Sequence, residues 1–393
     1  MELKRVVVAI DSFKGSISSR VAGEAAAEAI KSVCPACIIT VYPLADGGEG
    51  TVDALCDGLG GEIIETDVTG PLGSKVKSRY GYLPAQHTAI IEMADAAGLA
   101  MVPPGRRNPL YTTTYGLGEL ILAACEHGCR RFIIGIGGSA TNDAGLGMLT
   151  ALGAKFYRAD GAAVGIYGKD LQDVAQADFS DMAPVLSACS FSIACDVTNP
   201  LIGSAGCSAV FGPQKGATPE IVQNMDHAMA RFAQVTDKAE TARLAGAGAA
   251  GGLGFAFAAF LHGELKPGIE LVLDTLQIDK GLRQADLLLT GEGRMDAQSV
   301  MGKAPVGIAA RAKRLQPDIM TVAVCGSAAA DAAAVNAHGI DAYFPILQEP
   351  ISLDRAMAPE MAKQNLYLTV KQMIHLICIN RMFDTAVKGQ EGV

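Results

Sequence analysis

Residues 5–10 read RVVVAI, residues 11–16 read DSFKGS, and residues 18–33 read SSRVAGEAAAEAIKSV. The first stretch is an uninterrupted apolar run, which is typical of a strand buried on both faces of a parallel sheet. The second predicts a loop, and the third predicts an alanine-rich helix that begins with serine. The run CIITVYPL at residues 37–44 predicts a second strand. Together these stretches indicate a doubly wound α/β domain.

The C-terminal part of the chain repeats this alternation. Apolar runs predict three further strands, at residues 285–290, 321–327 and 341–346. Residues 291–299, GEGRMDAQS, predict a loop, and residues 302–314 predict a helix. A last helix is predicted from Pro359 to about Met382, because apolar residues recur there at helical spacing. These residues are Leu366, Val370, Met373 and Ile377.

The two ends of the chain therefore predict one discontinuous domain, formed by residues 1–70 and 285–393. Residues 71–284 predict an inserted, mixed α/β domain with a less regular alternation. A chain of 393 residues is too long for one ordinary hydrophobic core, which agrees with two domains. Small-molecule sites commonly lie between domains, so we expect the active site in the interdomain cleft.

Composition disfavours several classes of partner. The formal net charge is −9 and tryptophan is absent, so we expect no nucleic-acid and no membrane partner. The apolar run before Asp11 is too short for the core of a signal peptide. The uncharged run at residues 244–261 is mostly alanine and glycine, which is too weakly apolar for a membrane span. We expect a cytoplasmic protein that binds a small molecule, and a homodimer is left open.

The ten cysteines do not indicate a disulfide framework, because most lie in apolar runs of a long chain. Cys34 and Cys37 form a CPAC motif. Neither a second CxxC pair nor a histidine pair follows, so a zinc or redox site is disfavoured.

Five glycine-containing segments follow apolar strands, and the carboxyl ends of parallel strands converge on one crevice. In the first segment, Asp11, Ser12 and Lys14 precede a helix, so the lysine and the free helix N–H groups could hold an anion. A helix cap with a solvated lysine is the alternative. In the second, Asp46 and Glu49 lie among glycines and could bind Mg²⁺ or substrate hydroxyls. An acidic turn is the alternative there.

The third segment, residues 135–145, reads GIGGSATNDAG and joins a strand to a helix. Its backbone N–H groups predict a nest for nucleotide phosphates, formed at Gly137, Gly138, Ser139 and Thr141. It is not a Walker A loop, since no Gly-Lys-Ser/Thr follows, and it is not a G-x-G-x-x-G fingerprint. Tight packing between strand and helix is the alternative.

The fourth segment places Asp196 at the end of the strand FSIA, where an aspartate is a good general-base candidate. An Asx turn before Pro200 is the alternative. Asn199, in the same loop, is a candidate substrate ligand. Residues 211–216, FGPQKG, add a lysine in a glycine-containing loop.

The fifth segment contains Gly291, Glu292, Gly293 and Arg294. An arginine can pair bidentately with a carboxylate or a phosphate, and a neighbouring carboxylate can hold a metal or orient the arginine. The glycines predict close approach of the backbone to a nucleotide. An exposed loop with an internal ion pair is the alternative.

Absent motifs narrow the chemistry. The six histidines are scattered, and neither HExxH nor GxSxG occurs. Zinc hydrolysis and serine hydrolysis are therefore poorly supported. Phosphoryl transfer fits what remains, because it requires cations, Mg²⁺-binding carboxylates and a base for the acceptor hydroxyl. Two rival classes are an NAD(P)-dependent oxidoreductase of a small hydroxy acid, which lacks its fingerprint here, and a non-catalytic two-lobed binding protein.

The motifs taken together resemble the bacterial type-1 glycerate kinase family, in the family's order and over nearly the whole chain. They are DSFKGSISS (11–19), PLADGGEGT (43–51), GIGGSATNDAGLGML (135–149), ACDVTNPL (194–201), FGPQKGAT (211–218), GAGAAGGLGFA (246–256) and TGEGRMDAQSVMGKAP (290–305). The resemblance implies a flavodoxin-like domain interrupted by an inserted α/β domain. It also implies phosphorylation of D-glycerate by ATP, usually to the 2-phosphate, with the 3-phosphate as the alternative.

On this basis we assign hypothetical roles. Asp196 is expected to act as the general base, and Lys14 and Arg294 are expected to bind the glycerate carboxylate or the migrating phosphoryl group. Expected substrate contacts are Asp11, Ser12, Asp46, Glu49 and Asn199. Expected nucleotide contacts are Gly137, Gly138, Ser139, Thr141, Gly291 and Gly293. Expected Mg²⁺ ligands are Asp46 and Glu292.

Overall fold

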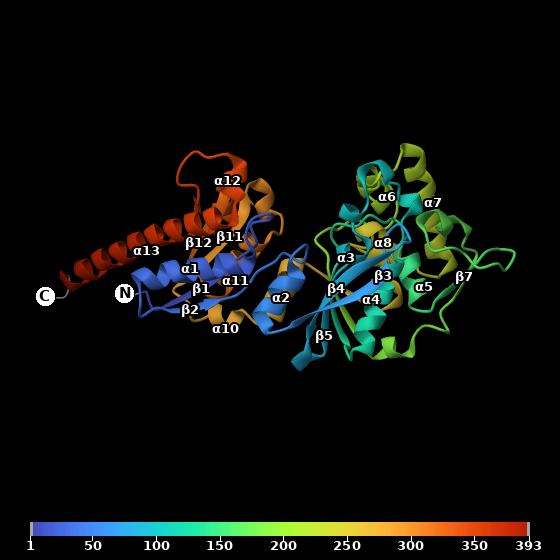
Figure 1. Ribbon diagram of the computed structural model, residues 1–393, viewed down its shortest axis with the longest axis horizontal. Helices are drawn as coiled ribbons and strands as arrows, with labels where there is room; N and C mark the ends of the chain where they lie inside the picture. Colours follow the sequence, from blue (N-terminus) through green and yellow to red (C-terminus); the bar gives the residue numbers. More distant parts are fainter. Residues whose placement is uncertain (1–2, 391–393) are drawn as a thin grey trace. The chain divides into compact units, whose positions relative to one another are not determined.

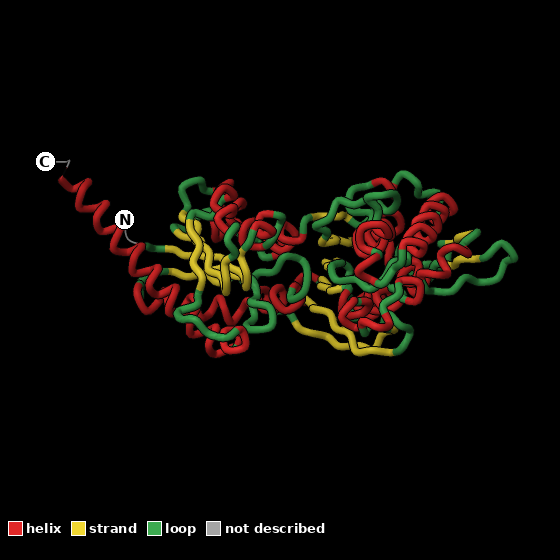
Figure 2. Tube along the Cα trace, turned by 90° about the horizontal axis from the view of Figure 1, so that it is seen from above, coloured by secondary structure: helices red, strands yellow, loops and turns green. Residues whose placement is uncertain are grey.

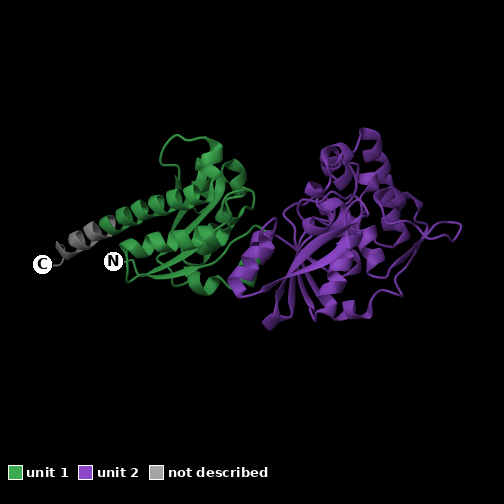
Figure 3. Cartoon of the chain, in the orientation of Figure 1, with its two compact units in different colours: residues 1–46, 272–393 green, residues 47–271 purple. Residues whose placement is uncertain are grey.

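The structure, a computed structural model, describes the backbone of residues 3–390 and the side chains of residues 3–379. The chain divides into two compact units (Figure 3). Unit 1 consists of residues 1–46 and 272–393, and unit 2 consists of residues 47–271. Each unit is a layered α/β structure of its own.

Unit 1 is built on a five-stranded sheet with the order β13-β12-β11-β1-β2, in which every neighbouring pair is parallel. Its strands are β1 (Arg5–Ile10), β2 (Ile38–Val41), β11 (Leu287–Met295), β12 (Met320–Ala328) and β13 (Ala342–Pro345). Counted within the unit, this order is 2-1-3-4-5, which is the flavodoxin-like order. The apolar run of β1 is buried as predicted.

Helices cover both faces of this sheet, as Figure 2 shows. On one face, Val6, Val8 and Ile10 pack against α1 (Ser19–Val33) and α13 (Pro359–Gln390), which lie side by side (Figure 1). On the other face, residues of β12 pack against α11 (Ala304–Leu315). The remaining α-helices of the unit are α10 (Asp279–Leu282) and α12 (Leu353–Met357), and α9 (Gly268–Thr275) begins in unit 2 and ends in unit 1.

The predicted apolar face of the last helix is confirmed. Leu366, Val370 and Met373 are buried in the unit 1 core, and Ile377 packs against it. No disulfide joins the ten cysteines, all of which lie in the described part of the chain. Cys34 Sγ lies 3.2 Å from Cys378 Sγ, so the CPAC turn contacts α13.

Unit 2 is built on a six-stranded mixed sheet with the order β10-β9-β6-β5-β4-β3. Its strands are β3 (Glu62–Thr69), β4 (Lys75–Leu83), β5 (Thr88–Glu92), β6 (Arg131–Gly135), β9 (Ser190–Ala194) and β10 (Glu264–Lys266). The strands from β10 to β5 are parallel, whereas β4 and β3 are antiparallel additions. A separate ladder joins β7 (Lys155–Tyr157) to β8 (Gln176–Asp178).

The helices of unit 2 enclose a core that includes stacked phenylalanines, with the ring centroids of Phe132 and Phe191 4.9 Å apart. The helices are α2 (Thr51–Leu59), α3 (Ala94–Ala97), α4 (Tyr115–Glu126), α5 (Leu146–Ala151), α6 (Cys207–Phe211), α7 (Pro219–Val235) and α8 (Ala249–Phe260). Among the described residues, none of the helices is both long enough and apolar enough to cross a membrane.

The boundaries of the units differ from the predicted domain boundaries at residues 70 and 285. Strand β3 lies in unit 2, because it pairs along its whole length with β4. Conversely, residues 272–284 lie in unit 1. There Arg311 Nη2 lies 2.7 Å from Asp274 Oδ1, and its Nε lies 2.6 Å from Asp279 Oδ1, which binds this segment to α11. The apolar pattern of the sequence indicates neither the pairing of β3 with β4 nor the ion pairs of Arg311.

The predicted loop at residues 291–299 is wrong over its first half. Strand β11 continues to Met295, because its extension pairs with β12, with Arg294 opposite Ser327 and Met295 opposite Ala328. Gly291, Glu292, Gly293 and Arg294 are therefore strand residues. Glycine at 291 has a packing reason, since a Cβ there would lie 2.2 Å from Val324 O.

The start of α8 also depends on glycine. Ala250, Gly251 and Gly252 have left-handed backbone angles there, with φ of 53°, 68° and 93°. A Cβ at Gly251 would lie 2.1 Å from Thr141 O, and Ala144 N donates to Gly251 O at 2.9 Å. The glycine-rich segment therefore fixes residues 141–144 by direct backbone contact.

We predict that Gly251→Ala is strongly destabilising. The change adds a backbone clash to the cost of a left-handed alanine, which is about 1–2 kcal/mol. The matched control is Gly128→Ala, because Gly128 has φ of 95° and a Cβ there meets no atom within 4 Å. Urea unfolding should give a larger loss for Gly251→Ala by about 1–3 kcal/mol. Equal losses would show that the contact with Thr141 is unimportant.

Candidate active site

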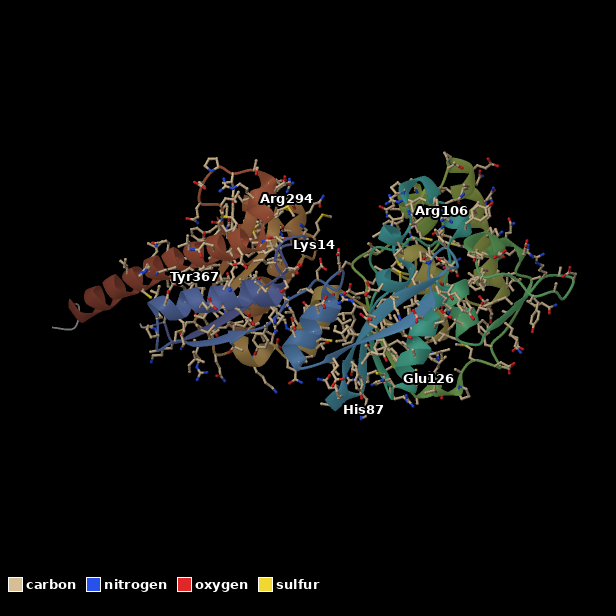
Figure 4. All side chains as sticks on the ribbon, viewed as in Figure 1. Lys14, His87, Arg106, Glu126, Arg294 and Tyr367 are labelled. Atoms are coloured by element: carbon tan, nitrogen blue, oxygen red, sulfur yellow. The ribbon has the colours of Figure 1, made fainter. Side chains whose placement is uncertain are left out.

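Unit 1 gathers polar residues at the carboxyl ends of β1, β2 and β11, as parallel pairing requires. Asp11 follows β1, and its backbone N donates to Gly291 O at 2.9 Å. Gly293 lies beside the loop after β1, since a Cβ at Gly293 would lie 3.4 Å from Phe13 Cα and 3.7 Å from Lys14 N. Figure 4 labels Lys14 and Arg294, whose side chains both come from this end of the sheet. The first and fifth predicted segments are thus neighbours.

The carboxyl group of Asp11 is the buried centre of this group, with 9% of the residue exposed. Its Oδ1 accepts a hydrogen bond from Ser12 N at 2.6 Å. Burial, and then the nearby charge of Asp46, raise the pKa of Asp11 to about 7, while Ser12 and Lys14 act in the opposite direction. Asp11 is therefore a carboxyl group that titrates near neutral pH.

Glu292 is also buried and already has partners. Ser299 Oγ donates to its Oε1 at 2.5 Å, and Lys303 Nζ lies 3.4 Å from its Oε2. Burial raises the pKa of Glu292 despite these partners. Lys303 Nζ also lies 3.6 Å from Asp296 Oδ1. The arrangement holds Lys303 beside the strand end, as a cation to which the sequence had given no role.

Lys14 and Arg294 offer positive charge at the surface of this group. Lys14 is exposed. The Arg294 side chain is 71% exposed, and its Nε lies 3.6 Å from Asp296 Oδ2, a distance typical of a weak surface pair. Both cations are therefore available to an anionic ligand.

The acidic residues of this group are candidate ligands for Mg²⁺. No group of three or more His, Cys, Asp or Glu side chains suited to a metal occurs among the described residues. Mg²⁺ in phosphoryl-transfer enzymes, however, usually takes only one or two carboxylates and draws further oxygens from phosphate and water. Asp46 and Glu292 both raise the pKa of Asp11 by electrostatic repulsion. A divalent cation would relieve this concentration of negative charge, so the donor set fits.

Unit 2 carries a second group of polar residues, at the carboxyl ends of its parallel strands. Residues 135–145, the glycine-rich loop, follow β6. Gly137 and Gly138 are exposed, whereas Ser139 is 7% exposed. The loop is held against α3 and the turn after it, because Leu99 N donates to Gly138 O at 2.8 Å and Ala140 N donates to Ala97 O at 2.9 Å. A ligand can therefore approach the backbone at Gly137 and Gly138.

The second half of this loop is buried. Thr141 and Asn142 have no exposed surface, so Thr141, a predicted nucleotide contact, presents no surface to a ligand in this structure. The reason is that Thr141 O accepts a hydrogen bond from Lys215 Nζ at 2.6 Å, on the inner side of the loop. The carbonyl group of Thr141 therefore has a structural role, and nucleotide contact by Thr141 stays a prediction.

Asp143 organises the turn into α5 and was missed by the sequence analysis. It is fully buried, and its Oδ2 accepts hydrogen bonds from Thr114 N at 2.9 Å, Thr114 Oγ1 at 2.8 Å and Gly147 N at 3.3 Å. Its Oδ1 accepts from Gly145 N at 3.2 Å. Burial raises the pKa of Asp143 against these bonds. The motif TNDAG gave no sign that this residue faces the interior.

Asp196 follows β9 and is exposed. Its Oδ1 accepts a hydrogen bond from Gly268 N at 2.8 Å, so the backbone after β10 fixes the orientation of the carboxylate. Asn199 has a structural bond, from its Nδ2 to Ala205 O at 2.8 Å. An oriented and accessible carboxylate at a strand end is suited to accepting a proton.

The acidic segment after Asp46 enters unit 2 beside β6, and Glu49 is exposed there. A Cβ at Gly135 would lie 2.4 Å from Gly47 O, so this segment packs directly on the end of β6. Glu92, another residue that the sequence analysis missed, accepts hydrogen bonds from Gly50 N at 3.0 Å and Val52 N at 2.9 Å. Burial raises the pKa of Glu92 to about 7. The start of α2 is thus capped by a distant side chain.

The structure brings the predicted residues together in two groups, one in each unit. Unit 1 holds Asp11, Ser12, Lys14, Asp46, Gly291, Glu292, Gly293 and Arg294, and unit 2 holds Glu49, Gly137, Gly138, Ser139, Thr141, Asp196 and Asn199. The fold and these groups give a two-unit α/β protein whose strand ends carry the acidic, basic and glycine-rich segments that phosphoryl transfer to a small molecule requires.

Comparison with known proteins specifies the class. Residues 6–378 match the model of the glycerate kinase family. The glycerate kinase of Bacillus subtilis is 46% identical over 355 residues, which are 90% of this chain and 92% of the relative. The glycerate 2-kinase of Escherichia coli is 44% identical over 355 residues, which are 90% of this chain and 93% of the relative.

A solved structure agrees with these relatives. The crystal structure of a putative glycerate kinase 2 from Salmonella typhimurium LT2 superposes with a TM-score of 0.88 at 42% identity, and it covers 97% of this chain and 100% of its own. The chain belongs to the glycerate kinase family. This finding confirms the resemblance and the two-unit α/β fold that it implied.

We predict a pH-dependent stabilisation by Asp11→Asn. Because the folded-state pKa of Asp11 is raised from 3.8 to about 7, the native protein binds more protons than the unfolded chain between these values, and stability falls as pH rises through them. The asparagine removes this loss. The variant should be more stable than the wild type at pH 8, by on the order of 1–4 kcal/mol, and the gain should vanish near pH 4.

Urea unfolding at both pH values measures this effect, with the exposed Asp318→Asn as control. The control should show no comparable gain. A wild type and an Asp11→Asn variant that differ equally at pH 4 and pH 8 would contradict the raised pKa.

Proposed function

We propose that this protein transfers the γ-phosphoryl group of ATP to a hydroxyl group of D-glycerate and that the product is 2-phosphoglycerate. The proposal is carried by one observation. The chain belongs to the glycerate kinase family, and its parallel strands end in acidic, basic and glycine-rich residues that phosphoryl transfer requires. The choice of the 2-hydroxyl rests on the Escherichia coli relative, whose name is glycerate 2-kinase.

The proposed reaction has a simple proton and bond balance. The hydroxyl oxygen of glycerate attacks the γ-phosphorus, the bond from that phosphorus to the β–γ bridging oxygen breaks, and ADP leaves. We assign the hydroxyl proton to the carboxylate of Asp196. Gly268 N–H orients that carboxylate from Oδ1, which supports the assignment. A positioned base of this kind contributes about 10²–10⁴-fold.

Lys14 and Arg294 supply positive charge in the proposal. Glycerate carries one carboxylate, and the migrating phosphoryl group carries negative charge on its equatorial oxygens. Both side chains are exposed at neighbouring strand ends. Asp11, Ser12 and Asp46 lie at the same edge and serve the hydroxyl groups of the substrate. Glu49 and Asn199, of unit 2, remain candidate substrate contacts.

For the nucleotide, the exposed backbone at Gly137 and Gly138, with Ser139 next to it, is the best-supported phosphate nest. Gly291 and Gly293 remain weaker candidates, since Gly291 has a packing role. Mg²⁺ would be held through Asp46 and Glu292, and it would neutralise charge on the phosphates. We further propose that both groups of residues serve one reaction in a cytoplasmic enzyme.

A coupled ADP-release assay with ATP and D-glycerate, with and without Mg²⁺, tests the activity. ³¹P NMR of the product distinguishes the 2-phosphate from the 3-phosphate. The proposal expects Mg²⁺-dependent release of ADP and a 2-phosphate signal. ADP release that does not depend on D-glycerate would refute the activity, and a 3-phosphate signal would refute the assignment of the hydroxyl.

Asp196→Asn should lower kcat by about 10²–10⁴-fold and leave the KM for ATP nearly unchanged. Asparagine keeps an oxygen that can accept from Gly268 N, so the loop is preserved while the base is lost. The matched control is Asp226→Asn, because Asp226 likewise accepts from a backbone N–H, that of Gly203, at 2.9 Å. Steady-state kinetics give the answer, and an unchanged kcat in Asp196→Asn would remove Asp196 from this role.

Lys14→Ala should raise the KM for D-glycerate or lower kcat, with a loss in kcat/KM of roughly 10²-fold, because one charge-stabilising donor is removed. Lys4→Ala is the control, since Lys4 is an exposed lysine at the opposite end of β1. The control should be kinetically normal. Wild-type constants in Lys14→Ala would exclude contact between Lys14 and the reacting groups.

A further inference from the structure

We infer that Lys215 is a positioning residue for nucleotide binding: its buried ammonium group holds the glycine-rich loop of residues 135–145 in the shape that receives phosphate. The inference rests on the proposed function, and it concerns a side chain that is itself not exposed to any ligand. Lys215 ends the short 3-10 helix η7 (Pro213–Lys215), which is remote in sequence from the loop.

The burial of Lys215 is exceptional for a lysine. Only 2% of the residue is exposed, and it is among the largest fully buried side chains in the protein. Lysines are almost never buried completely without a partner, because desolvation of the ammonium group is costly. This burial lowers the pKa of Lys215 to about 8. A residue kept under such a cost needs a compensating role.

The partners of the ammonium group identify that role. Lys215 Nζ donates to Ser139 Oγ at 2.7 Å and to Thr141 O at 2.6 Å. The titratable groups that act electrostatically on Lys215 are Cys207 and Asp143, and the Asp143 carboxylate accepts hydrogen bonds from Thr114, Gly145 and Gly147. Both hydrogen bonds donated by Lys215 are therefore accepted within residues 139–141 of the loop.

The bonded stretch directly follows the exposed glycines. Ser139 is adjacent to Gly138, and its backbone also bridges to Gly98. The loop is thus bound at three places: to α3 and the turn after it, to the start of α8 through Gly251, and to Lys215. The contacts with α3 and α8 are made by the backbone, whereas Lys215 contributes a charged side chain. A desolvated cation that is bonded to the residues next to a backbone nest favours an anion at that nest, because electrostatic interactions are stronger where water is excluded.

A purely structural lysine would behave differently from a positioning one. If Lys215 only stabilises the fold, its loss lowers stability and leaves the affinity of the folded protein for ATP intact. If Lys215 shapes the nest, its loss weakens ATP binding more than D-glycerate binding. The affinity for ATP relative to the affinity for D-glycerate is therefore the decisive readout.

The test uses Lys215→Met, Ser139→Ala and the double variant. Methionine retains an apolar chain of similar length and removes the charge and the donors. Binding of ATP is measured by calorimetry without D-glycerate, together with both KM values and the thermal unfolding midpoint. Lys155→Met is the control, since Lys155 is an exposed lysine of unit 2 that pairs with Asp181.

Lys215→Met should weaken ATP binding by about 10- to 100-fold, because hydrogen bonds to a charged group are lost. The KM for D-glycerate should change far less, and Lys155→Met should match the wild type. Because the lysine acts partly through Ser139, Ser139→Ala should weaken ATP binding by itself and add little to Lys215→Met.

Unchanged ATP affinity in folded Lys215→Met would overturn the inference, and so would a larger effect on D-glycerate than on ATP. If Lys215→Met does not fold, Ser139→Ala decides: wild-type ATP affinity in that variant overturns the inference. Failure of the wild type to phosphorylate D-glycerate would refute the proposed function alone, because ATP binding is measured without that substrate.

Discussion

Parallel strand pairing is the constraint on which the rest of the structure depends. The unit 1 sheet is entirely parallel, and four neighbouring strands of the unit 2 sheet are parallel. In each sheet, chain segments remote in sequence must end at the same edge. Asp11 and Glu292 become neighbours for this reason, and so do the glycine-rich loop and Asp196. Parallel pairing therefore places side chains from several distant segments at one edge of each sheet.

The same edges concentrate charge inside the protein. Asp11, Glu92, Asp143 and Lys215 are all buried, and each has a pKa shifted by burial toward its neutral form. Burying such groups costs free energy unless hydrogen bonds compensate. Glu92 and Asp143 are compensated by several backbone donors, and they shape loops. Asp11 is compensated less, and it lies among the residues proposed to act on substrate. If Asp11 has this proposed role, stability and function are opposed at this residue.

The sequence predicted the strands of the unit 1 sheet, because burial on both faces leaves a continuous apolar run such as that of β1. The sequence did not predict the features that depend on contacts between distant segments of the chain. β11 extends past Thr290 because β12 pairs with it. Glu92 caps a helix 40 residues away. The motif FGPQKG indicated only a lysine in a glycine-containing loop, whereas Lys215 is buried and donates to residues 139 and 141 of another loop. Each failure concerns a residue whose partner lies elsewhere in the chain.

The most direct measurement of the central claim is hydrogen–deuterium exchange of the wild-type protein with ligands added one at a time. We propose that the ligands bind at the carboxyl ends of the parallel strands. A non-hydrolysable ATP analogue should slow exchange at the amides of residues 137–140, and D-glycerate should slow exchange at residues 11–16. Protection confined to other segments by both ligands would contradict it.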